Sequence, residues 1–596
     1  MRPALRLPAG LFDNVWANRL PLSICALGLV VFSRSLFCGF VRDDHAQIVQ
    51  NPQVQSWDYL PGLLLSHLWN QQPGAAAHHL FYRPLFSVWM LLVHTAGGLE
   101  PWFWHLASIV LHLAATWLVF RLCLHLTGSE AGAGVAAALF AVHPIHVDAV
   151  TWVSASNEVL FTVLLLGSLL LLLEETPGIC VRLWPSAALF CAAMFSKETA
   201  LAMLPVLIAV AWVRLSKSGG LNPARRIWNS SLPYLVATVL YALARVAATD
   251  RIRPENGEHS WAEVIFSSPS IFLFYLNKLL LPLRLSPSYV NLLTSQPTKG
   301  FWFELLAVLL GLALVSVIAI KYSAPIGLAA AWIVLPILPA LAVLRIYPDG
   351  DMTHDRYLYA PSVGLSILVA MLVQHFWSKG KIVQRIVLAV AAVLICSLAN
   401  LTFAQQRYYQ DDLTFYQRAI QVDPANGAAY SAVGDIYLDQ GRIDLALENH
   451  RKAHQVAPDN PQITLLLARA LFTAKSYPET EALLNQLLQK KDLGSTHRIS
   501  ARLSLANLEI EVKNPQAAQA LLQQVEDEDP NAPDLHWAKA VLFQREGLFP
   551  QAQAEYEREY QISGDPAAKR QSLILAKKNQ RYPALSVKPT PQPSAQ

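Results

Sequence analysis

Long apolar stretches occupy the first two thirds of the chain, and regular polar–apolar helices follow them. Up to about residue 403, apolar runs of about 20 residues recur, the length that a helix needs to cross roughly 30 Å of hydrocarbon. Two shorter apolar stretches, 82–97 and 269–284, contain aromatic or interrupting residues and are predicted to lie at the membrane interface. The pattern predicts about eleven spans, at residues 20–40, 102–126, 130–147, 158–174, 183–197, 199–215, 230–247, 301–320, 323–344, 357–376 and 382–402.

Small and aromatic residues recur at a fixed period in the polar part of the chain. Gly434 and Ala446 are small where the two helices of a repeat are expected to touch, and weaker units follow at 461–494, 499–532 and 533–566. Such units bury their faces only against their neighbours, so the period predicts an α-solenoid. Tetratricopeptide spacing is clearest in NGAAYSAVGDIYLDQGRIDLALENHRKAHQVAPDN, through Tyr430, Gly434, Tyr437, Ala446, Ala453 and Pro458.

These patterns predict an all-α protein in three parts. Residues 1–403 form a polytopic membrane domain whose first outer loop covers about 41–101. Residues 404–566 form the tetratricopeptide-repeat domain, and 567–596 hold the end of a C-terminal helix and a disordered proline-rich tail.

Composition supports a membrane protein and argues against nucleic acid as a partner. Hydrophobic residues make up 54% of the chain and charged residues 15%, against about 25% in an average soluble protein. The formal net charge of +4 is too small to indicate nucleic-acid binding. All six cysteines lie in or beside apolar segments, so no disulfide framework is expected in the repeats.

The distribution of basic residues predicts the orientation of the spans. With the N-terminus inside and with 82–97 and 269–284 not crossing, the inner loops carry basic residues with few acids, whereas the outer segments hold mixed charge, which is the positive-inside pattern. Eleven spans then place the repeats on the outer side, in the same compartment as the first outer loop. The inner basic residues are Arg2, Arg6, Arg19, Arg182, Lys217, Arg225, Arg226, Lys321, Lys379 and Lys381.

Polar residues gather at the outer ends of the predicted spans. Ionisable groups near hydrocarbon are costly and usually functional, so we expect these groups to share one cavity. A carboxylate there can take a proton from an incoming nucleophile, while cations hold a phosphate and stabilise it as it leaves. The outer groups are Asp43 and Asp44, Arg83, His143, His146 and Asp148, Asn157 and Glu158, Lys197 and Glu198, and Asp355 and Arg356.

Each group also has a simpler interpretation. Two acids after a span are typical of a solvated loop, and Lys197 beside Glu198 could pair or snorkel at the interface. Arg356 beside tyrosines is typical of an interfacial anchor. The His-x-x-His pattern in HPIHVD could hold a metal, but no third strong ligand lies nearby, and no metal site is assigned. The gathering of five polar clusters on one side favours a functional site.

Several of these motifs together resemble a known family. FVRDDHAQIVQNPQV, FYRPLF, HPIHVDAVTWVSASNE, FSKETAL and DRYLYAPSVG, followed by the repeats, are similar to the transmembrane and tetratricopeptide-repeat O-mannosyltransferase family. The likeness runs from about Phe40 to the end of the repeats. It implies a membrane glycosyltransferase of the class C fold that moves mannose or another hexose from a polyprenyl-phosphate (or dolichyl-phosphate) donor to an acceptor hydroxyl, usually with inversion.

The resemblance also implies roles for individual residues. Asp43 matches the first acid of the outer-loop pair and would be the general base, and Asp44 would orient the acceptor or share that role. Arg83, Lys197 and Arg356 match positive positions that would contact the donor phosphate. His143, His146 and Asp148 match an outer turn and, with Glu158, would support the site.

The resemblance implies partners and a location as well. The lipid-linked sugar is the only cofactor-like molecule expected, and help from a divalent metal is left open. A protein Ser or Thr is the expected acceptor, presented by the repeats. The repeats contain no Asn-x-Ser/Thr sequon and the chain does not end in Lys-Asp-Glu-Leu. Both features favour a bacterial inner membrane with periplasmic repeats over the endoplasmic reticulum lumen.

Two other functions stay open on the sequence alone. A non-enzymatic membrane scaffold would use the repeats to dock a protein partner, since tetratricopeptide surfaces are general peptide-binding grooves. A transporter is the third possibility, although the membrane half shows no internal repeat or paired broken spans.

Overall fold

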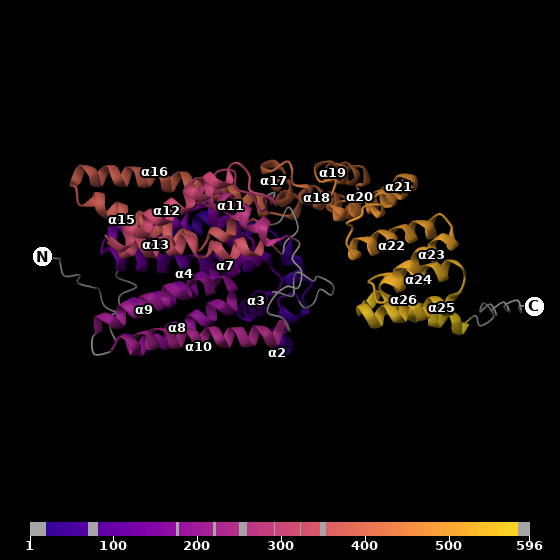
Figure 1. Cartoon of the computed structure of the whole chain (residues 1–596), viewed down its shortest axis with the longest axis horizontal. Helices are drawn as coiled ribbons and strands as arrows, with labels where there is room; N and C mark the ends of the chain where they lie inside the picture. The colour runs from indigo at the N-terminus through magenta and orange to yellow at the C-terminus, as the bar shows by residue number, and fades with distance from the viewer. Residues whose placement is uncertain are drawn as a thin grey trace, which may run out of the picture. The chain divides into compact units, whose positions relative to one another are not determined.

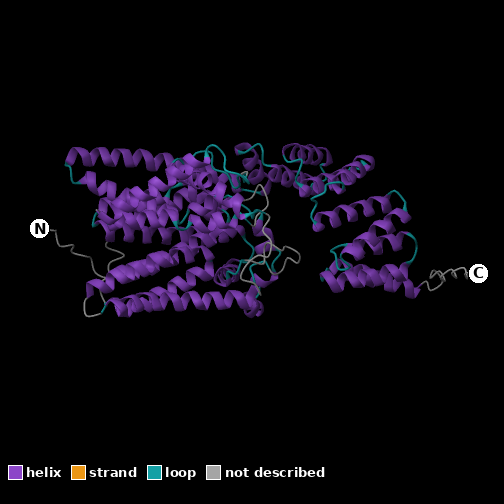
Figure 2. Cartoon of the chain, viewed as in Figure 1, coloured by secondary structure: helices purple, strands orange, loops and turns teal. Residues whose placement is uncertain are grey.

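The computed structural model describes residues 19–69, 81–174, 178–218, 222–249, 259–290, 293–321, 323–345 and 353–581. The regular elements in these ranges are helices joined by loops, and β structure there is limited to one isolated bridge between Tyr289 and Thr353 (Figure 2). The all-α prediction is therefore confirmed. The chain separates into two compact units, residues 1–424 and 425–596.

The first unit is a bundle of long apolar helices (Figure 1). Within the described residues, nine helical segments are long and apolar enough to cross a membrane. They contain α1 (Arg19–Phe32), α4 (Pro101–Thr127), α7 (Asn157–Leu173), α8 (Ile179–Ser196), α9 (Leu204–Ser218), α10 (Pro223–Thr249), α12 (Phe301–Lys321), α13 (Ala324–Val334) with α14 (Ile337–Val343), and α16 (Lys381–Gln405). The chain is a multi-pass membrane protein.

The two other predicted spans are also helices, but each departs from a straight 20-residue span. The span predicted at 130–147 is α5 (Glu130–Ala141) followed by Pro144–Thr151, which includes α6 (Val147–Thr151), with a bend of 48° between the two parts. Pro144 lies at the break and lacks the backbone N–H that would continue the helix. The span predicted at 357–376 is α15 (Pro361–Trp377), with 17 residues.

Two glycines allow the central helices to pack closely. A Cβ atom on Gly132 of α5 would lie 2.6 Å from the Ala370 carbonyl oxygen of α15. A Cβ atom on Gly364 of α15 would lie 2.3 Å from the Ala329 carbonyl oxygen of α13. Small residues at helix crossings are the usual way in which membrane helices approach one another. These contacts fix the helices that lead to the polar site.

Shorter elements carry the polar loops between the long helices. The helices are α2 (Leu60–Leu65), α3 (Pro84–Gly97), α11 (Trp261–Leu280) and α17 (Asp412–Val422). The turns that matter below are η1 (Ser33–Phe37), η2 (His45–Val49), η6 (Pro144–His146), η7 (Val153–Ser156), η8 (Glu198–Met203) and η9 (Asp355–Leu358). Of the two stretches predicted at the interface, 82–97 forms α3, which has 14 residues and is about 21 Å long. The stretch 269–284 lies mostly in α11, which has 20 residues and is about 30 Å long.

The second unit is a stack of helix pairs with a final helix, α26 (Pro566–Arg581). A Cβ atom on Gly434 would lie 2.7 Å from the ring of His450, and Ala446 is fully buried, so the two helices of the first pair touch where the sequence predicted. The predicted tail beyond residue 581 lies outside the described residues. The pairs are α18 (Gly427–Asp439) and α19 (Ile443–Val456), α20 (Pro461–Thr473) and α21 (Tyr477–Leu488), α22 (Ser495–Glu511) and α23 (Pro515–Glu528), and α24 (Leu535–Arg545) and α25 (Phe549–Ser563).

Candidate active site

Asp43 and Asp44 lie on one short turn between η1 and η2, but their side chains have different surroundings. The Asp44 carboxylate is buried. Its Oδ2 accepts a hydrogen bond from the Val41 N–H at 3.1 Å, and its Oδ1 accepts from the N–H and the hydroxyl of Ser154 at 2.7 and 2.5 Å. Asp43 instead lines a cavity. Of the two acids, Asp43 is therefore the one that a molecule in the cavity can contact.

The cavity has a volume of about 80 Å³, enough for several water molecules. Of the polar residues predicted to share one cavity, those that line it are Asp43, Arg83, Asn157, Glu158, Lys197, Glu198 and Arg356. Apolar and aromatic groups complete the wall, including Trp152, Phe161 and Tyr357. The structure thus brings together seven of the predicted polar residues, which come from well-separated segments of the chain.

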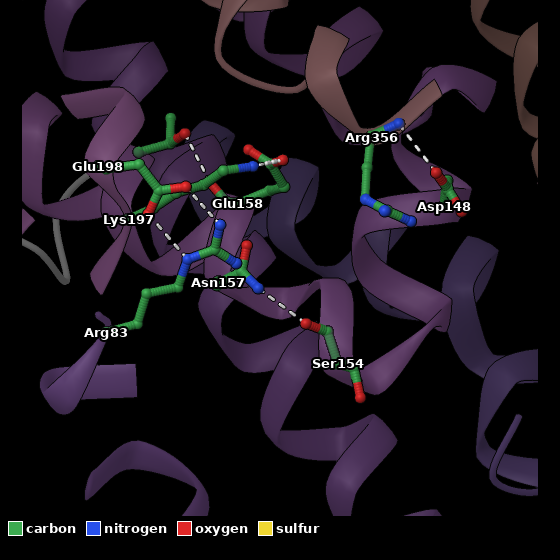
Figure 3. Close-up of polar contacts among 9 residues, drawn as sticks. Arg83, Asp148, Ser154, Asn157, Glu158, Lys197, Glu198 and Arg356 are labelled. Carbon is green, nitrogen blue, oxygen red and sulfur yellow. Dashed lines mark hydrogen bonds and ion pairs between the residues drawn. The ribbon is translucent and has the colours of Figure 1, made fainter. Parts of the chain in front are cut away.

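Two ion pairs hold the cations of two segments in place (Figure 3). Arg83, just before α3, donates from Nε and Nη2 to the two carboxylate oxygens of Glu198 in η8, at 2.9 and 2.5 Å. Lys197 donates from Nζ to Glu158 in the first turn of α7. Only 6% of the Lys197 side chain and 2% of the Glu158 side chain are exposed, so the second pair is shielded from water.

Arg356 reaches the cavity from η9 and is held by two kinds of contact. Its backbone N–H donates to Asp148 Oδ2 at 3.0 Å. Its guanidinium lies 4.4 Å from the ring centroid of Trp152 and 5.4 Å from that of Tyr357, within range for cation–π attraction. The Lys197 ammonium lies 4.9 Å from the same Tyr357 ring. One tyrosine therefore borders two of the three cations.

The predicted outer-turn residues lie behind the cavity and not in its wall. The Asp148 carboxylate accepts from the Tyr409 hydroxyl at 2.9 Å as well as from the Arg356 backbone, so it holds the turn that carries Arg356. His146 contacts the Ser362 hydroxyl at 2.8 Å, and the His143 side chain accepts from the Ile145 N–H at 3.3 Å. All three side chains are buried. Among the described residues, no cluster of three or more potential metal ligands occurs.

An apolar groove borders the polar cavity. It has a volume of about 550 Å³, and α2, α3, α8 and α10 contribute to its walls. Tyr82 and Phe195, whose rings pack edge to face at 6.1 Å, line the groove. Arg83 follows Tyr82 directly and Lys197 comes two residues after Phe195, so the linings of the groove and of the cavity adjoin at these two places in the chain. A ligand with a charged head and a long apolar tail matches this pair of sites.

Sequence reasoning did not assign several residues that shape the site. Glu198 was noted beside Lys197, but its pairing with Arg83 joins two segments 115 residues apart. Ser154 and Gln47 also line the cavity. Gln47 follows Asp43 by four residues, a spacing that places both side chains on one face of a helical turn. This spacing could have indicated that Gln47 lines the cavity together with Asp43.

Burial of Asp44 gives a testable pH dependence of stability. Desolvation outweighs its hydrogen bonds and raises the pKa of Asp44 from its ordinary value near 3.8 to about 7. The folded protein therefore keeps a proton that the unfolded chain loses, and its stability should fall as the pH rises from about 4 to about 7. Asp44→Asn should make the melting temperature in detergent less dependent on pH over this range. An unchanged pH dependence in the variant would contradict the assignment.

The repeats and most of the chain match known proteins. Models of the tetratricopeptide repeat match residues 437–503 and 503–568. Protein O-mannosyl-transferase Tmtc3 of Drosophila melanogaster is 25% identical over 536 residues, which cover 77% of this chain and 57% of that protein. Human protein O-mannosyl-transferase TMTC3 is 24% identical over 529 residues, with 80% and 56% covered. The chain thus spans a little over half the length of these relatives.

A likeness to a solved structure also extends over most of the chain. The crystal structure of ArnT from Cupriavidus metallidurans bound to undecaprenyl phosphate aligns with a TM-score of 0.37 and 15% identity, covering 80% of this chain and 81% of that one. The relatives and the repeats agree with the motifs of the sequence. The chain is similar, over most of its length, to the transmembrane and tetratricopeptide-repeat O-mannosyltransferase family.

Proposed function

We propose that the chain is a membrane glycosyltransferase of the class C type. It moves mannose or another hexose from a polyprenyl-phosphate donor to a hydroxyl of an acceptor, with a protein Ser or Thr as the expected acceptor. The observation that carries the proposal is the cavity in which Asp43 meets Arg83, Lys197 and Arg356, next to an apolar groove. The similarity to proteins named protein O-mannosyl-transferases supports the same reaction.

The proposed reaction divides the cavity residues into a base and a set of phosphate ligands. The Asp43 carboxylate takes the proton of the acceptor hydroxyl as its oxygen bonds to the anomeric carbon of the sugar. The bond from that carbon to the phosphate oxygen breaks, and its electron pair goes to the phosphate. Arg83, Lys197 and Arg356 stabilise the charge that develops there, through hydrogen bonds to charged groups that are stronger than neutral ones.

The groove would hold the isoprenoid tail of the donor, and this assignment predicts a change in KM. Ala188 is an exposed residue of the groove wall, so Ala188→Trp should fill the groove and raise the KM for a long-chain donor about tenfold or more, because each buried CH₂ contributes about 0.8 kcal/mol. A short-chain donor should be affected far less. Val390→Trp on α16 is the control, since Val390 is 53% exposed and lies outside the groove lining. Equal KM changes for both donors would exclude the groove as the tail site.

We place the reaction on the extracytoplasmic face, with the N-terminus in the cytoplasm and the repeats outside, in a bacterial inner membrane and its periplasm. The basic inner loops support this orientation. A cysteine introduced at Gln53 or at Lys452 should then react with a membrane-impermeant reagent in intact cells, and one introduced at Lys379 should not. The background is Cys180→Ser/Cys396→Ser, because both native thiols are exposed. Labelling of the cysteine at position 379 would contradict this orientation.

The repeats would select or present the protein acceptor. A groove of about 510 Å³ between α22 and α24, lined by Ser500, Asn507 and Trp537, offers both polar groups and an aromatic surface for a peptide. The same groove supports a second candidate function, a scaffold that docks a protein partner without chemistry. A scaffold would tolerate Asp43→Asn and lose partner capture when Trp537 is replaced, whereas a transferase would lose product formation with either change.

A transfer assay tests the proposed function. The purified protein in lipid vesicles receives polyprenyl-phosphate mannose with a labelled sugar and a protein extract of the outer compartment. Transfer of label to protein, released by alkaline β-elimination as expected for sugars on Ser or Thr, would support it. Incorporation no higher than in vesicles without the protein would contradict it.

A further inference from the structure

The turn that carries Asp43 has an unusual backbone. Arg42, the residue before it, has a φ of +51°, a left-handed conformation that residues with a Cβ atom adopt rarely. Such a conformation persists only when surrounding contacts hold it, and it is concentrated at functional sites. At this turn it separates the two acids, so that Asp44 faces Ser154 while Asp43 faces the cavity. What holds Arg42 in place therefore also determines where the Asp43 carboxylate lies.

Asp412 holds the turn at two points. Its Oδ1 accepts a hydrogen bond from the Arg42 backbone N–H at 2.7 Å, and its Oδ2 lies 2.8 Å from His45 Nε2. The two contacts flank Asp43, one residue before it and two residues after it. The hydrogen bond that His45 donates to Asp412 is the main reason why the pKa of His45 is raised, and the charged imidazole in turn strengthens the contact. One carboxylate, about 370 residues away in the sequence, thus clamps both sides of the turn.

Asp412 is itself fixed by the packing of α17. Asp411 caps this helix by accepting from the Thr414 N–H at 2.8 Å, and the preceding Gln410 carbonyl accepts from the Gly39 N–H at 2.9 Å. Phe415 is fully buried, with its ring centroid 5.4 Å from that of Trp152. Trp152 is the ring over which both Arg42 and Arg356 lie. Helix α17 therefore supports both the turn that carries Asp43 and, through Trp152, the proposed phosphate ligand Arg356.

We propose that Asp412 is a positioning residue that holds Asp43 in its productive place. The inference rests on the proposed role of Asp43 as general base. Asp412 is the first residue of α17, the last helix of the first unit, which ends at residue 424. Asp412 makes no chemical step; it sets the position from which Asp43 takes the proton.

The test compares Asp412→Ala with Asp411→Ala in the full-length protein in vesicles. Asp411→Ala removes the N-terminal cap of α17 but keeps both contacts of Asp412 with the turn. It is therefore the matched control for an effect that comes only from a less stable helix. Asp412→Ala should lower kcat about tenfold to a hundredfold, as expected for a misplaced catalytic group, while the donor KM changes less than about threefold. Asp412→Asn should fall between the two, because its amide oxygen can still accept from Arg42. A kcat for Asp412→Ala equal to that of Asp411→Ala would overturn the inference.

Backbone substitutions at Arg42 provide a second test. Glycine adopts a positive φ without strain, so Asp412→Ala/Arg42→Gly should recover part of the lost kcat. Asp412→Ala/Arg42→Ala removes the same side chain without relieving the backbone and should recover none. Equal activity of the two double variants would overturn the inference.

Hydrogen exchange separates failure of the clamp from failure of the proposed function. The Arg42 amide should exchange faster in Asp412→Ala than in Asp411→Ala, whether or not Asp43 is the base. Unchanged exchange would refute the clamp. If exchange rises as expected but Asp43→Asn keeps full transfer activity, the clamp exists and the role of Asp43 is wrong, so Asp412 is not a positioning residue for catalysis.

Discussion

Asp43→Asn should insert and fold like the wild-type chain and lose sugar transfer by a factor of about 10² to 10⁴, the usual contribution of a general base. Asp43 lines the cavity, and the change to asparagine keeps its size while removing the group that takes the proton. The measurement is the initial rate of transfer of labelled mannose from polyprenyl phosphate to protein in vesicles. Donor binding should change little, since the three cations of the cavity stay in place.

The control for this variant is Asp58→Asn. Asp58 is an exposed acid of the same outer loop and accepts a hydrogen bond from the neighbouring Ser56. Its replacement makes the same change of charge in the loop and should leave the rate within about twofold, since most surface substitutions have small effects. Equal rates for wild type and Asp43→Asn would remove Asp43 from the mechanism.

Lys197→Met should both destabilise the protein and abolish transfer. It leaves Glu158 buried without its ion-pair partner, and breaking a buried pair in this way costs about 3–5 kcal/mol. The double variant Lys197→Met/Glu158→Gln removes both charges and should recover most of the thermal stability, but not the activity, because the phosphate ligand is still missing. Thermal unfolding in detergent and the transfer rate measure the two effects.

The account of the Lys197–Glu158 pair requires that the double variant regain thermal stability without regaining transfer. A double variant that regains both stability and transfer would show that Lys197 serves the fold alone. A Lys197→Met variant as stable as the wild type would show that the buried pair contributes little to stability. Either result would contradict part of the account of the cavity.

Much of the fold follows from the sequence because its signals are local and repeated. A span is recognisable by its length and apolar character, and all eleven predicted spans coincide with helices of the structure. The bend after Ala141 is less predictable, since the apolar pattern runs through it. In the repeats, the close contact at Gly434 leaves a residue-size pattern that recurs with the period of the helix pairs.

The site was only partly predictable because its details depend on long-range contacts. The sequence could show that Arg83, Lys197 and Arg356 each lie at an end of an apolar stretch, because apolar stretches are recognisable locally. The left-handed backbone of Arg42 determines which of the two adjacent acids faces the cavity. An arginine gives no sequence signal for a positive φ, so this conformation could not be predicted. The carboxylate of Asp412 acts on that turn from a distant segment, without any local motif.

The most direct test of the proposed function is mass spectrometry of the proteins in the outer compartment. Cells that make the wild-type chain are compared with cells that make Asp43→Asn at the same abundance. The account predicts hexose additions on Ser or Thr of a set of proteins with the wild-type chain, and the loss of these additions with the variant. The same additions in both cell types would contradict it.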